Sequence, residues 1–523
     1  MKKDKKQRRK VRQAKKQKRN SDPIEELKRK DKQKHKEQFP NLDPGMIDWL
    51  VDYNEEKYPN HRLLGGFDGA QELLSGNRVT DSRSIDSVLK VGMNYRDFQQ
   101  LSLYHQTGFF ENHNKFNQEG MLLLPQILSP MGGRVFGELM FACAAKVMYY
   151  LPKNTDMTFL GLGAGPGYLD FDLINHLQSK MFGMPEYQNV VDAFKNAKYI
   201  VSDLTAKSLE HLTKELAELK ARSGLRERIS LQQIDALDFD LGRLPFGAVY
   251  FNELIDNMPT EPILKIGGEL YCVKLVPYCL NGRGEDSSDV EAVGVVLGLK
   301  GVISENRFRE RVKHRDVSDI RFAPVFIPLS YDREIMEAVN DSPCTKKIDS
   351  KDFSGVYPIH MGLGQLFRSV RKSFDHGVLM SVDYRSTGQG MHNWNKAVNI
   401  FKYMEFGKED MDFQLDSEQV VAKALQYDLF PEQMEGIGTN FGDILDCFKE
   451  WTMFLQREDL ERWSRLNPGV GGSGFLKQKG GGLLEMMGSA MGVPDMGIKA
   501  AYMMNYGFMI DFAKNYDSLL FVF

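Results

Sequence analysis

Short apolar strands alternate with amphipathic helices from about residue 158 onward, and this alternation limits the fold more than any other feature of the sequence. Strand–helix–strand order favours parallel strands, because a crossover helix returns the chain to the same edge of the sheet. We therefore expect an α/β fold with a doubly wound, mostly parallel sheet. Strands are predicted at 158–160, 199–201, 229–231, 248–251 and 377–382, with helices at 169–177 and 206–219 and near 361–374 and 416–428.

Two further regions flank and interrupt this core. Residues 41–155 read as mostly helical, and the run from Phe136 to Leu151 has helical spacing that ends before Pro152. The runs LYCVKLVPY (270–278) and AVGVVLGLKGVI (292–303) are β-like, which predicts an inserted β-rich segment for substrate binding or closure. The expected division is a basic tail (1–40), a helical N-terminal region (41–155), the first part of the core (156–264), the insertion (265–350), and the second part of the core with a helical, Met-rich C-terminal region (351–523).

Charge is distributed unevenly along the chain. Residues 1–40 hold 18 Lys/Arg against 6 Asp/Glu, which leaves 50 against 65 of the 68 and 71 in the whole sequence. The tail is too polar to bury a core, so it is predicted to be disordered. It could contact RNA, a ribosome or another anionic surface, or it could only keep the protein in solution, and its charge does not decide between these.

Cysteine and histidine usage bears on the compartment and on metals. The 5 cysteines are scattered without a CxxC pair, which suits a reducing compartment and argues against a thiolate metal site. The 10 histidines form no HxxxH or HExxH pair, so no metal is predicted. No apolar run is long enough for a membrane span, and no apolar signal segment opens the chain. We expect a soluble cytoplasmic protein, with the mitochondrial matrix as an alternative.

The first chemical signal is the turn Gly163-Ala164-Gly165-Pro166-Gly167, which follows a predicted strand and opens a helix. Glycines are needed where the backbone turns tightly and must approach a ligand closely. In this context the turn favours a nucleotide-containing cofactor over a plain structural turn. The spacing differs from the GxGxxG pattern of dinucleotide sites and suits S-adenosylmethionine (SAM) better.

Two aspartates at the ends of the next strands are further candidates for cofactor binding. Asp203 could accept hydrogen bonds from both ribose hydroxyls, although it could instead cap the helix that starts near Ala206. It lies 40 residues after Gly163, so 182–197 would be an insertion after the first helix. Asp235 could bind the adenine edge, but the acidity of its loop is an equally good explanation.

The segment FNELIDNMP (251–259) follows the strand at 248–251, at the edge of the sheet where substrate would meet cofactor. It contains neither the Pro-Pro-aromatic pattern used to methylate exocyclic base nitrogens nor a cysteine nucleophile for pyrimidine carbons. Glu253 and Asp256 could hold a guanidinium through bidentate hydrogen bonds and position one nitrogen for attack on a sulfonium methyl. Stabilisation of a helix N-terminus is the alternative role for this acidic pair.

These signals, in this order, resemble the MidA-type family of SAM-dependent methyltransferases, which includes the mitochondrial complex I assembly-factor methyltransferase. The resemblance covers roughly residues 93–515. The motifs that carry it are Leu103-Tyr104 with Gly108-Phe109-Phe110 (family LY…GYY), Ser129-Pro130 with Phe136-Gly137-Glu138 (S…FGE), FNELIDNMP (NEFFDALP) and Ser381-Val382-Asp383-Tyr384 (I-D-Y-G).

The resemblance implies a class I methyltransferase sheet, SAM as methyl donor and methylation of a protein arginine. By position, Gly163, Gly165, Gly167 and Asp203 would bind SAM, while Asn252, Glu253 and Asp256 would face the substrate. The sequence departs from the family where the acidic residue that opens E-x-G-x-G-x-G is Gly161. A weakly active or inactive assembly factor on the same fold, and an RNA-directed methyltransferase that uses the basic tail, are the alternative functions.

Overall fold

The computed structural model describes residues 77–112, 124–179, 188–222, 224–266, 268–342, 348, 355–384, 406–407, 413, 415–432, 439–455, 457–467, 502, 506, 509–510, 513–514 and 516–523. The chain forms two compact units, Gly65–Leu466 with Phe512–Phe523, and Met1–Leu64 with Asn467–Asp511. The basic tail and most of the C-terminal methionines lie outside the described residues. In the second unit, the described residues Tyr502, Tyr506 and Met509 are helical and buried.

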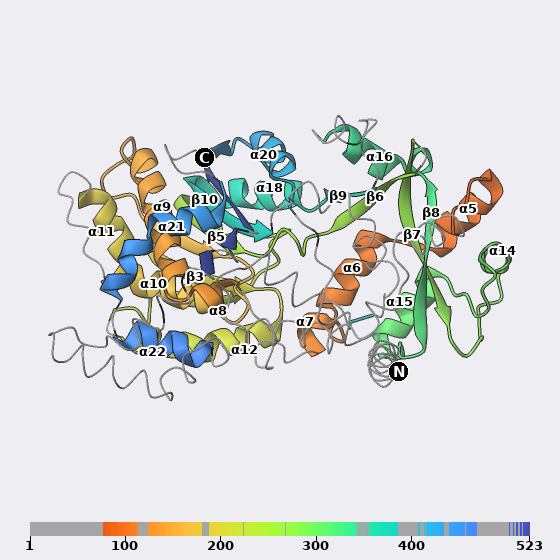
Figure 1. The fold of residues 1–523 in the computed structure, drawn as a ribbon, viewed down its shortest axis with the longest axis horizontal. Helices are drawn as coiled ribbons and strands as arrows, with labels where there is room; N and C mark the ends of the chain where they lie inside the picture. The colour runs from red at the N-terminus through yellow and green to blue at the C-terminus, as the bar shows by residue number, and fades with distance from the viewer. Residues whose placement is uncertain are drawn as a thin grey trace, which may run out of the picture. The chain divides into compact units, whose positions relative to one another are not determined.

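A seven-stranded sheet forms the core of the first unit, in the order β11-β12-β10-β5-β2-β3-β4. Figure 1 labels β3, β5 and β10 of this sheet. Five strands are parallel: β2 (Met157–Gly161), β3 (Lys198–Asp203), β4 (Ile229–Gln233), β5 (Leu244–Asn252) and β10 (Phe374–Tyr384). Strand β12 (Tyr516–Val522) is antiparallel to β10 and to β11 (Phe430–Pro431). The predicted doubly wound, mostly parallel sheet of the class I methyltransferase type is therefore confirmed, and so are the five strands predicted within it.

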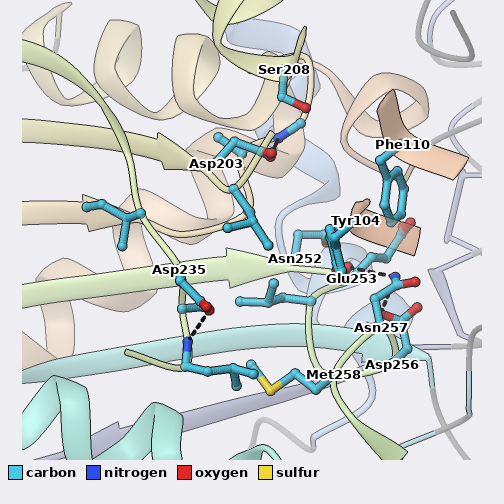
Figure 2. Close-up of a pocket in the computed structure, with 18 of the residues that line it drawn as sticks. Tyr104, Phe110, Asp203, Ser208, Asp235, Asn252, Glu253, Asp256, Asn257 and Met258 are labelled. Atoms are coloured by element: carbon cyan, nitrogen blue, oxygen red, sulfur yellow. Dashed lines mark hydrogen bonds between the residues drawn. The ribbon is translucent and has the colours of Figure 1, made fainter. Parts of the chain in front are cut away.

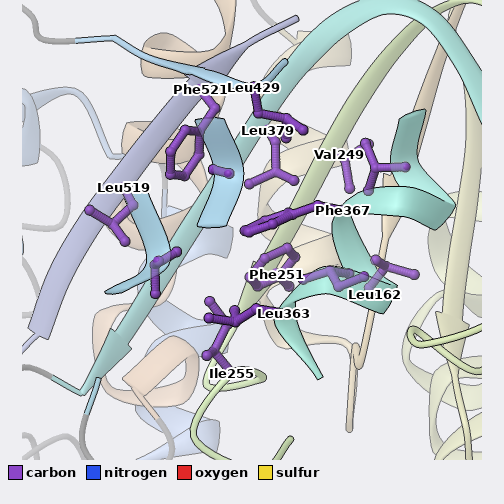
Figure 3. Close-up of a cluster of buried hydrophobic side chains, with 14 of the residues drawn as sticks. Leu162, Val249, Phe251, Ile255, Leu363, Phe367, Leu379, Leu429, Leu519 and Phe521 are labelled. Carbon is purple, nitrogen blue, oxygen red and sulfur yellow. The ribbon is translucent and has the colours of Figure 1, made fainter. Parts of the chain in front are cut away.

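Helices cover both faces of this sheet because the side chains of each strand alternate between the faces. On β2, Phe159 packs against Phe194 of α11 (Gln188–Asn196), next to α9 (Met131–Met148) and α10 (Tyr168–Ser179). The neighbouring Leu160 belongs to the core on the opposite face, where α18 (Leu363–Ser373) and α20 (Ser417–Leu425) pack. Figure 3 shows Leu363 and Phe367 of α18 in this core. Helix α9 starts earlier and ends three residues sooner than the predicted 136–151. Helices α12 (Ala206–Glu215) and α13 (Ala217–Ala221) follow β3, and α21 (Phe441–Cys447) and α22 (Arg457–Leu466) precede β12.

A second, wholly antiparallel sheet contains β1 (Met93–Asn94), β6 (Thr260–Ile266), β7 (Glu269–Cys279), β8 (Ile320–Pro328) and β9 (Gly355–His360). Its long strands run from Thr260 to His360, whereas the β-rich insertion is predicted at 265–350. Helices α6 (Tyr95–Tyr104) and α15 (Glu305–Lys313) contribute Phe98 and Phe308 to one buried cluster of this region. Helices α5 (Ser82–Val91), α14 (Ser288–Leu297) and α16 (Arg333–Asn340) contribute to another.

The β-like interpretation of AVGVVLGLKGVI (292–303) is wrong, because the first half of this run lies in α14. Its valines are typical of strands, but the flanking residues favour a helix. Ser287 caps the N-terminus by accepting a hydrogen bond from the Val290 amide, and Gly298 ends the helix in the left-handed conformation with a φ of 63°. Among the described helices, none has the length and apolarity needed to cross a membrane.

Candidate active site

A cavity lies at the carboxyl ends of the parallel strands, and Figure 2 shows side chains from several loops converging on it. It encloses about 1210 Å³ with its open mouth included. Ligands of open α/β sheets bind at this edge. The structure brings most of the predicted site residues to its lining, namely Gly163, Gly165, Asp203, Asp235, Asn252, Glu253 and Asp256.

The glycine turn after β2 presents its backbone to this cavity from Gly163 to Pro166. Gly163 has a φ of 59°, and a Cβ atom there would lie 2.8 Å from Leu254. Gly167 has a φ of 84° and stands outside the cavity lining, where a Cβ atom would lie 2.6 Å from Leu212 of α12. Gly163 therefore permits close packing of Leu254 against the turn, and Gly167 permits close packing of α12.

Asp203 joins the end of β3 to the glycine turn. Its Oδ2 accepts a hydrogen bond from the Gly165 amide at 2.9 Å, and its Oδ1 accepts from the Thr205 amide at 2.9 Å and the Thr205 hydroxyl at 3.1 Å. Thr205, rather than Asp203, is the N-cap of α12. Because a carboxylate offers about four acceptor positions, Asp203 retains little capacity for the two ribose hydroxyls expected from the sequence. Burial raises its pKa, and the hydrogen bonds from Thr205 and Gly165 oppose that rise.

Asp235 stabilises the loop after β4 and also reaches the cavity. Its Oδ1 accepts a hydrogen bond from the Leu237 amide at 2.9 Å, which closes a tight turn. Between these two residues the cavity is lined by Ala236, and Ile234 and Met258 add further apolar surface. Such a wall suits the flat face of a base. These apolar residues could not be predicted from the sequence, because nothing distinguishes them from ordinary core residues.

Glu253 has a strained backbone directly after β5. Its φ is 49°, a value that residues other than glycine rarely adopt. Its amide donates to the Val382 carbonyl at 2.9 Å, and its Oε1 accepts from the Leu124 amide at 3.2 Å. Asn252 also hydrogen-bonds to its side chain. Burial, followed by the charge of Asp383, raises the pKa of Glu253 to about 7. The strain is thus held by contacts that fix a carboxyl group at the cavity.

The turn that follows Glu253 is held by Asp383, at the end of β10. Asp383 Oδ2 accepts hydrogen bonds from the amides of Ile255 at 2.8 Å and Asp256 at 3.4 Å, and burial raises its pKa to about 7. Asp256 in turn accepts a hydrogen bond from the Asn257 side chain at 2.9 Å. The Oδ1 atom of Asn257 is buried and has no hydrogen-bond partner among the described residues. The sequence pointed to Asp383 only as part of a resemblance motif, and the structure places it directly behind the acidic turn.

The space beside Gly161 is filled by a carboxyl group from another element. A Cβ atom on Gly161 would lie 2.5 Å from Oδ1 of Asp170, which stands in the first turn of α10. The Tyr250 hydroxyl donates to the same oxygen at 2.6 Å. Burial raises the pKa of Asp170 to about 7. Asp170 therefore places a carboxyl group in the space that a side chain at position 161 would occupy.

Helix α6 supplies a wall of the cavity beside the acidic turn. Gln100 donates from its side chain to the Asn257 carbonyl at 3.2 Å, and Tyr104 lines the cavity one turn further along the helix. The Tyr104 ring lies 5.3 Å from that of Phe110, which also lines the cavity (Figure 2). Tyr104 and Phe110 belong to the LY…GFF motif, but sequence analysis did not include them or Gln100 among the site residues.

The charge of the cavity is one-sided. Asp203, Asp235, Glu253 and Asp256 line it, and no described lysine, arginine or histidine does. A pyrophosphate normally requires basic side chains or clustered backbone donors, and four carboxyl groups would oppose it. A ligand with a positive charge, such as a sulfonium or guanidinium group, is favoured instead. The apolar wall, the exposed turn backbone and the carboxyl groups together fit SAM.

Comparisons with known proteins give distant likenesses. No family model and no curated protein matches the sequence. The chain is similar to an uncharacterised protein from Burkholderia thailandensis, with 12% identity, a TM-score of 0.46, and coverage of 89% of this chain and 93% of that chain. It is similar to a methyltransferase candidate from the same organism bound to S-adenosylhomocysteine, with 13% identity, a TM-score of 0.48 and the same coverage of 89% and 93%.

A third solved structure, coclaurine N-methyltransferase bound to N-methylheliamine and S-adenosylhomocysteine, has 9% identity, a TM-score of 0.26, and coverage of 91% of this chain and 96% of that chain. All of these likenesses are weak. The fold assignment therefore depends on the strand order of the chain itself, and the chemistry of the site depends on the geometry of the cavity.

Proposed function

We propose that this protein is a SAM-dependent methyltransferase that modifies a protein side chain, with arginine as the acceptor. The observation that carries the proposal is the cavity that joins the glycine turn to Glu253 and Asp256 without any described basic side chain. A cavity of this kind favours two positively charged reactants, a sulfonium donor and a cationic acceptor.

The cofactor end of the cavity consists of the glycine turn, Asp203 and the loop 234–237. The turn backbone and the acceptor position that remains on Asp203 would hold the sugar and amino acid portions of SAM, and the apolar loop would hold the adenine. When bound, SAM would supply a methyl group activated by the positive sulfur, whose S–C bond to that methyl group breaks to leave S-adenosylhomocysteine. The resemblance to MidA-type methyltransferases supports this choice of cofactor.

The acceptor end consists of Asn252, Glu253, Asp256 and the wall formed by α6. A guanidinium between Glu253 and Asp256 would be oriented by hydrogen bonds, with one nitrogen directed toward the donor. Forming the new N–C bond requires the loss of one proton from that nitrogen. Glu253, with its pKa raised to about 7, is suited to receive this proton near neutral pH.

The alternative functions differ in what they require of the cavity. A binding or assembly factor without activity would not need SAM, and Asp170 beside Gly161 removes one reason to favour that role. An RNA substrate would bring phosphates toward four carboxyl groups, which is unfavourable. Contact of residues 1–40 with RNA or a ribosome remains a prediction outside the described residues.

Calorimetric titration with SAM and S-adenosylhomocysteine tests the cofactor, with NAD⁺ as a control that should not bind. Asp203→Ala should abolish binding, but it also frees the Gly165 and Thr205 amides. Asp235→Ala is therefore measured alongside it, with thermal melting to confirm folding. No SAM binding by the intact, folded protein would contradict the proposal.

A further inference from the structure

The wall formed by α6 has a second side that the proposed reaction does not use. An open depression runs along this helix and is lined by Asp97, Gln100, Leu101 and Tyr104, together with His105 and Arg309. The first four residues are spaced i, i+3, i+4 and i+7, so they form one face of the helix. All four are half-buried.

This depression adjoins the acceptor end of the cavity. Gln100 and Tyr104 line both spaces, and no residue of the glycine turn lines the depression. A large substrate whose side chain reaches Glu253 would therefore continue along α6, away from the cofactor. From Tyr104 to Asp97 the helix rises by about 10 Å, which equals about three residues of extended polypeptide.

The charge of the depression differs from that of the cavity. Arg309 of α15 is 37% exposed, and its Nη2 atom lies 3.9 Å from Oδ2 of Asp97, while its Nε and Nη2 atoms bind Glu305. No described residue pairs with Nη1, which leaves donors for a ligand. Burial lowers the pKa of His105, which lines the depression, and the positive charge of Arg315 lowers it further.

We propose that the face of α6 from Asp97 to Tyr104 binds the polypeptide that flanks the methylated side chain, and that Arg309 selects an acidic residue within about three positions of the acceptor. The inference rests on the proposed function, because it extends the acceptor site of that reaction. A polypeptide fits better than a nucleic acid, because the four carboxyl groups of the adjoining cavity would repel a phosphodiester backbone.

The test uses nine-residue synthetic peptides with one central arginine in a Gly/Ser background, and a parallel set with a central lysine. Each carries one glutamate, or glutamine in its place, at one of the six positions nearest the centre. Methyl transfer from labelled SAM is measured for the intact protein, Arg309→Gln and Arg307→Gln. Arg307 is a matched control, because it is exposed on the same helix but does not line the depression.

Glutamate should raise kcat/KM about threefold to tenfold over glutamine at one or two positions, the range expected for a partly screened ion pair. Arg309→Gln should remove this advantage without changing turnover of the glutamine peptides, and Arg307→Gln should keep it. A general structural effect of the substitution would lower turnover of both peptides.

Failure of this inference is distinct from failure of the proposed function. Equal turnover of all peptides, or an unchanged glutamate preference in Arg309→Gln, would overturn the flanking site while protein methylation stands. SAM binding without methylation of any peptide, or methylation of RNA oligonucleotides in the same assay, would overturn both.

Discussion

Replacing Glu253 with glutamine should stabilise the protein at high pH and stop methyl transfer. Burial and the nearby charge of Asp383 raise the pKa of Glu253 from 4.5 to about 7 in the folded protein. A raised carboxyl pKa means that folding favours the protonated form. Ionising Glu253 therefore lowers the free energy of unfolding. This loss is absent below the pKa of Glu253 in the unfolded chain, and it grows as pH rises toward the pKa in the folded protein. Glutamine resembles the protonated form and never causes this loss.

The size of the effect is set by the two pKa values. Each unit of pKa difference corresponds to about 1.4 kcal/mol, so ionising Glu253 costs about 3 kcal/mol at pH 8 and about 1 kcal/mol at pH 5. The free energy of unfolding of Glu253→Gln should therefore exceed that of the unmodified protein by about 2 kcal/mol more at pH 8 than at pH 5. Urea unfolding followed by tryptophan fluorescence across this pH range measures the difference.

Asp383→Asn provides the contrast, because Asp383 accepts hydrogen bonds from the Ile255 and Asp256 amides. Losing one acceptor oxygen should destabilise the protein by about 1–3 kcal/mol despite the similar pKa of the two carboxyl groups. A Glu253→Gln difference that does not change between pH 5 and pH 8 would refute the assignment of a raised pKa. A loss of SAM affinity by more than about twofold in Glu253→Gln would refute the placement of Glu253 at the acceptor end.

Three other substitutions test the supporting structure. Gly161→Glu should lower the melting temperature and weaken SAM binding, since its Cβ would meet Asp170; full binding by this variant would contradict the packing. Arg462→Met removes the ion pair to buried Asp172 and should cost about 3 kcal/mol, measured by urea unfolding at pH 7. The cost should fall at pH 5, because the pKa of Asp172 is raised to about 6 and the carboxyl group can then be protonated. Ser287→Ala should lower stability by about 1 kcal/mol through loss of the α14 cap, and no change in unfolding would argue against that cap.

The parallel core could be predicted because its signals are local. Strands such as β5 are continuous apolar runs bounded by turns, and the glycine turn marks where the first strand becomes a helix. Strand β12 at the C-terminus was missed because it is antiparallel and follows no strand–helix repeat. In α14, valines suggested a strand, while Ser287 and Gly298 decided for a helix. Caps are weak signals in a sequence but fix the ends of an element in the fold.

The candidate site divides in the same way. Residues at the cofactor end lie within or directly after strands, so the order of motifs along the chain already places Gly163, Asp203 and Asp235 at one edge. The wall beside the acidic turn comes from α6, which precedes that turn by about 150 residues in the chain. The position of α6 beside the acidic turn depends on tertiary packing, which the periodicity of the sequence does not reveal.

That packing explains why the sequence points to a cofactor more readily than to an acceptor. Adjacent residues of α6 project in different directions, so Gln99 accepts from the Thr260 amide at 3.0 Å while Gln100 donates to the Asn257 carbonyl at 3.2 Å. Thr260 begins the first strand of the second sheet after the acidic turn. The two glutamines therefore bind α6 to the junction between that turn and the second sheet. The acceptor end is complete only when the second sheet is folded, whereas the glycine turn and Asp203 belong to the parallel core alone. We therefore expect specificity for the acceptor to reside in the part of the chain with the fewest recognisable motifs.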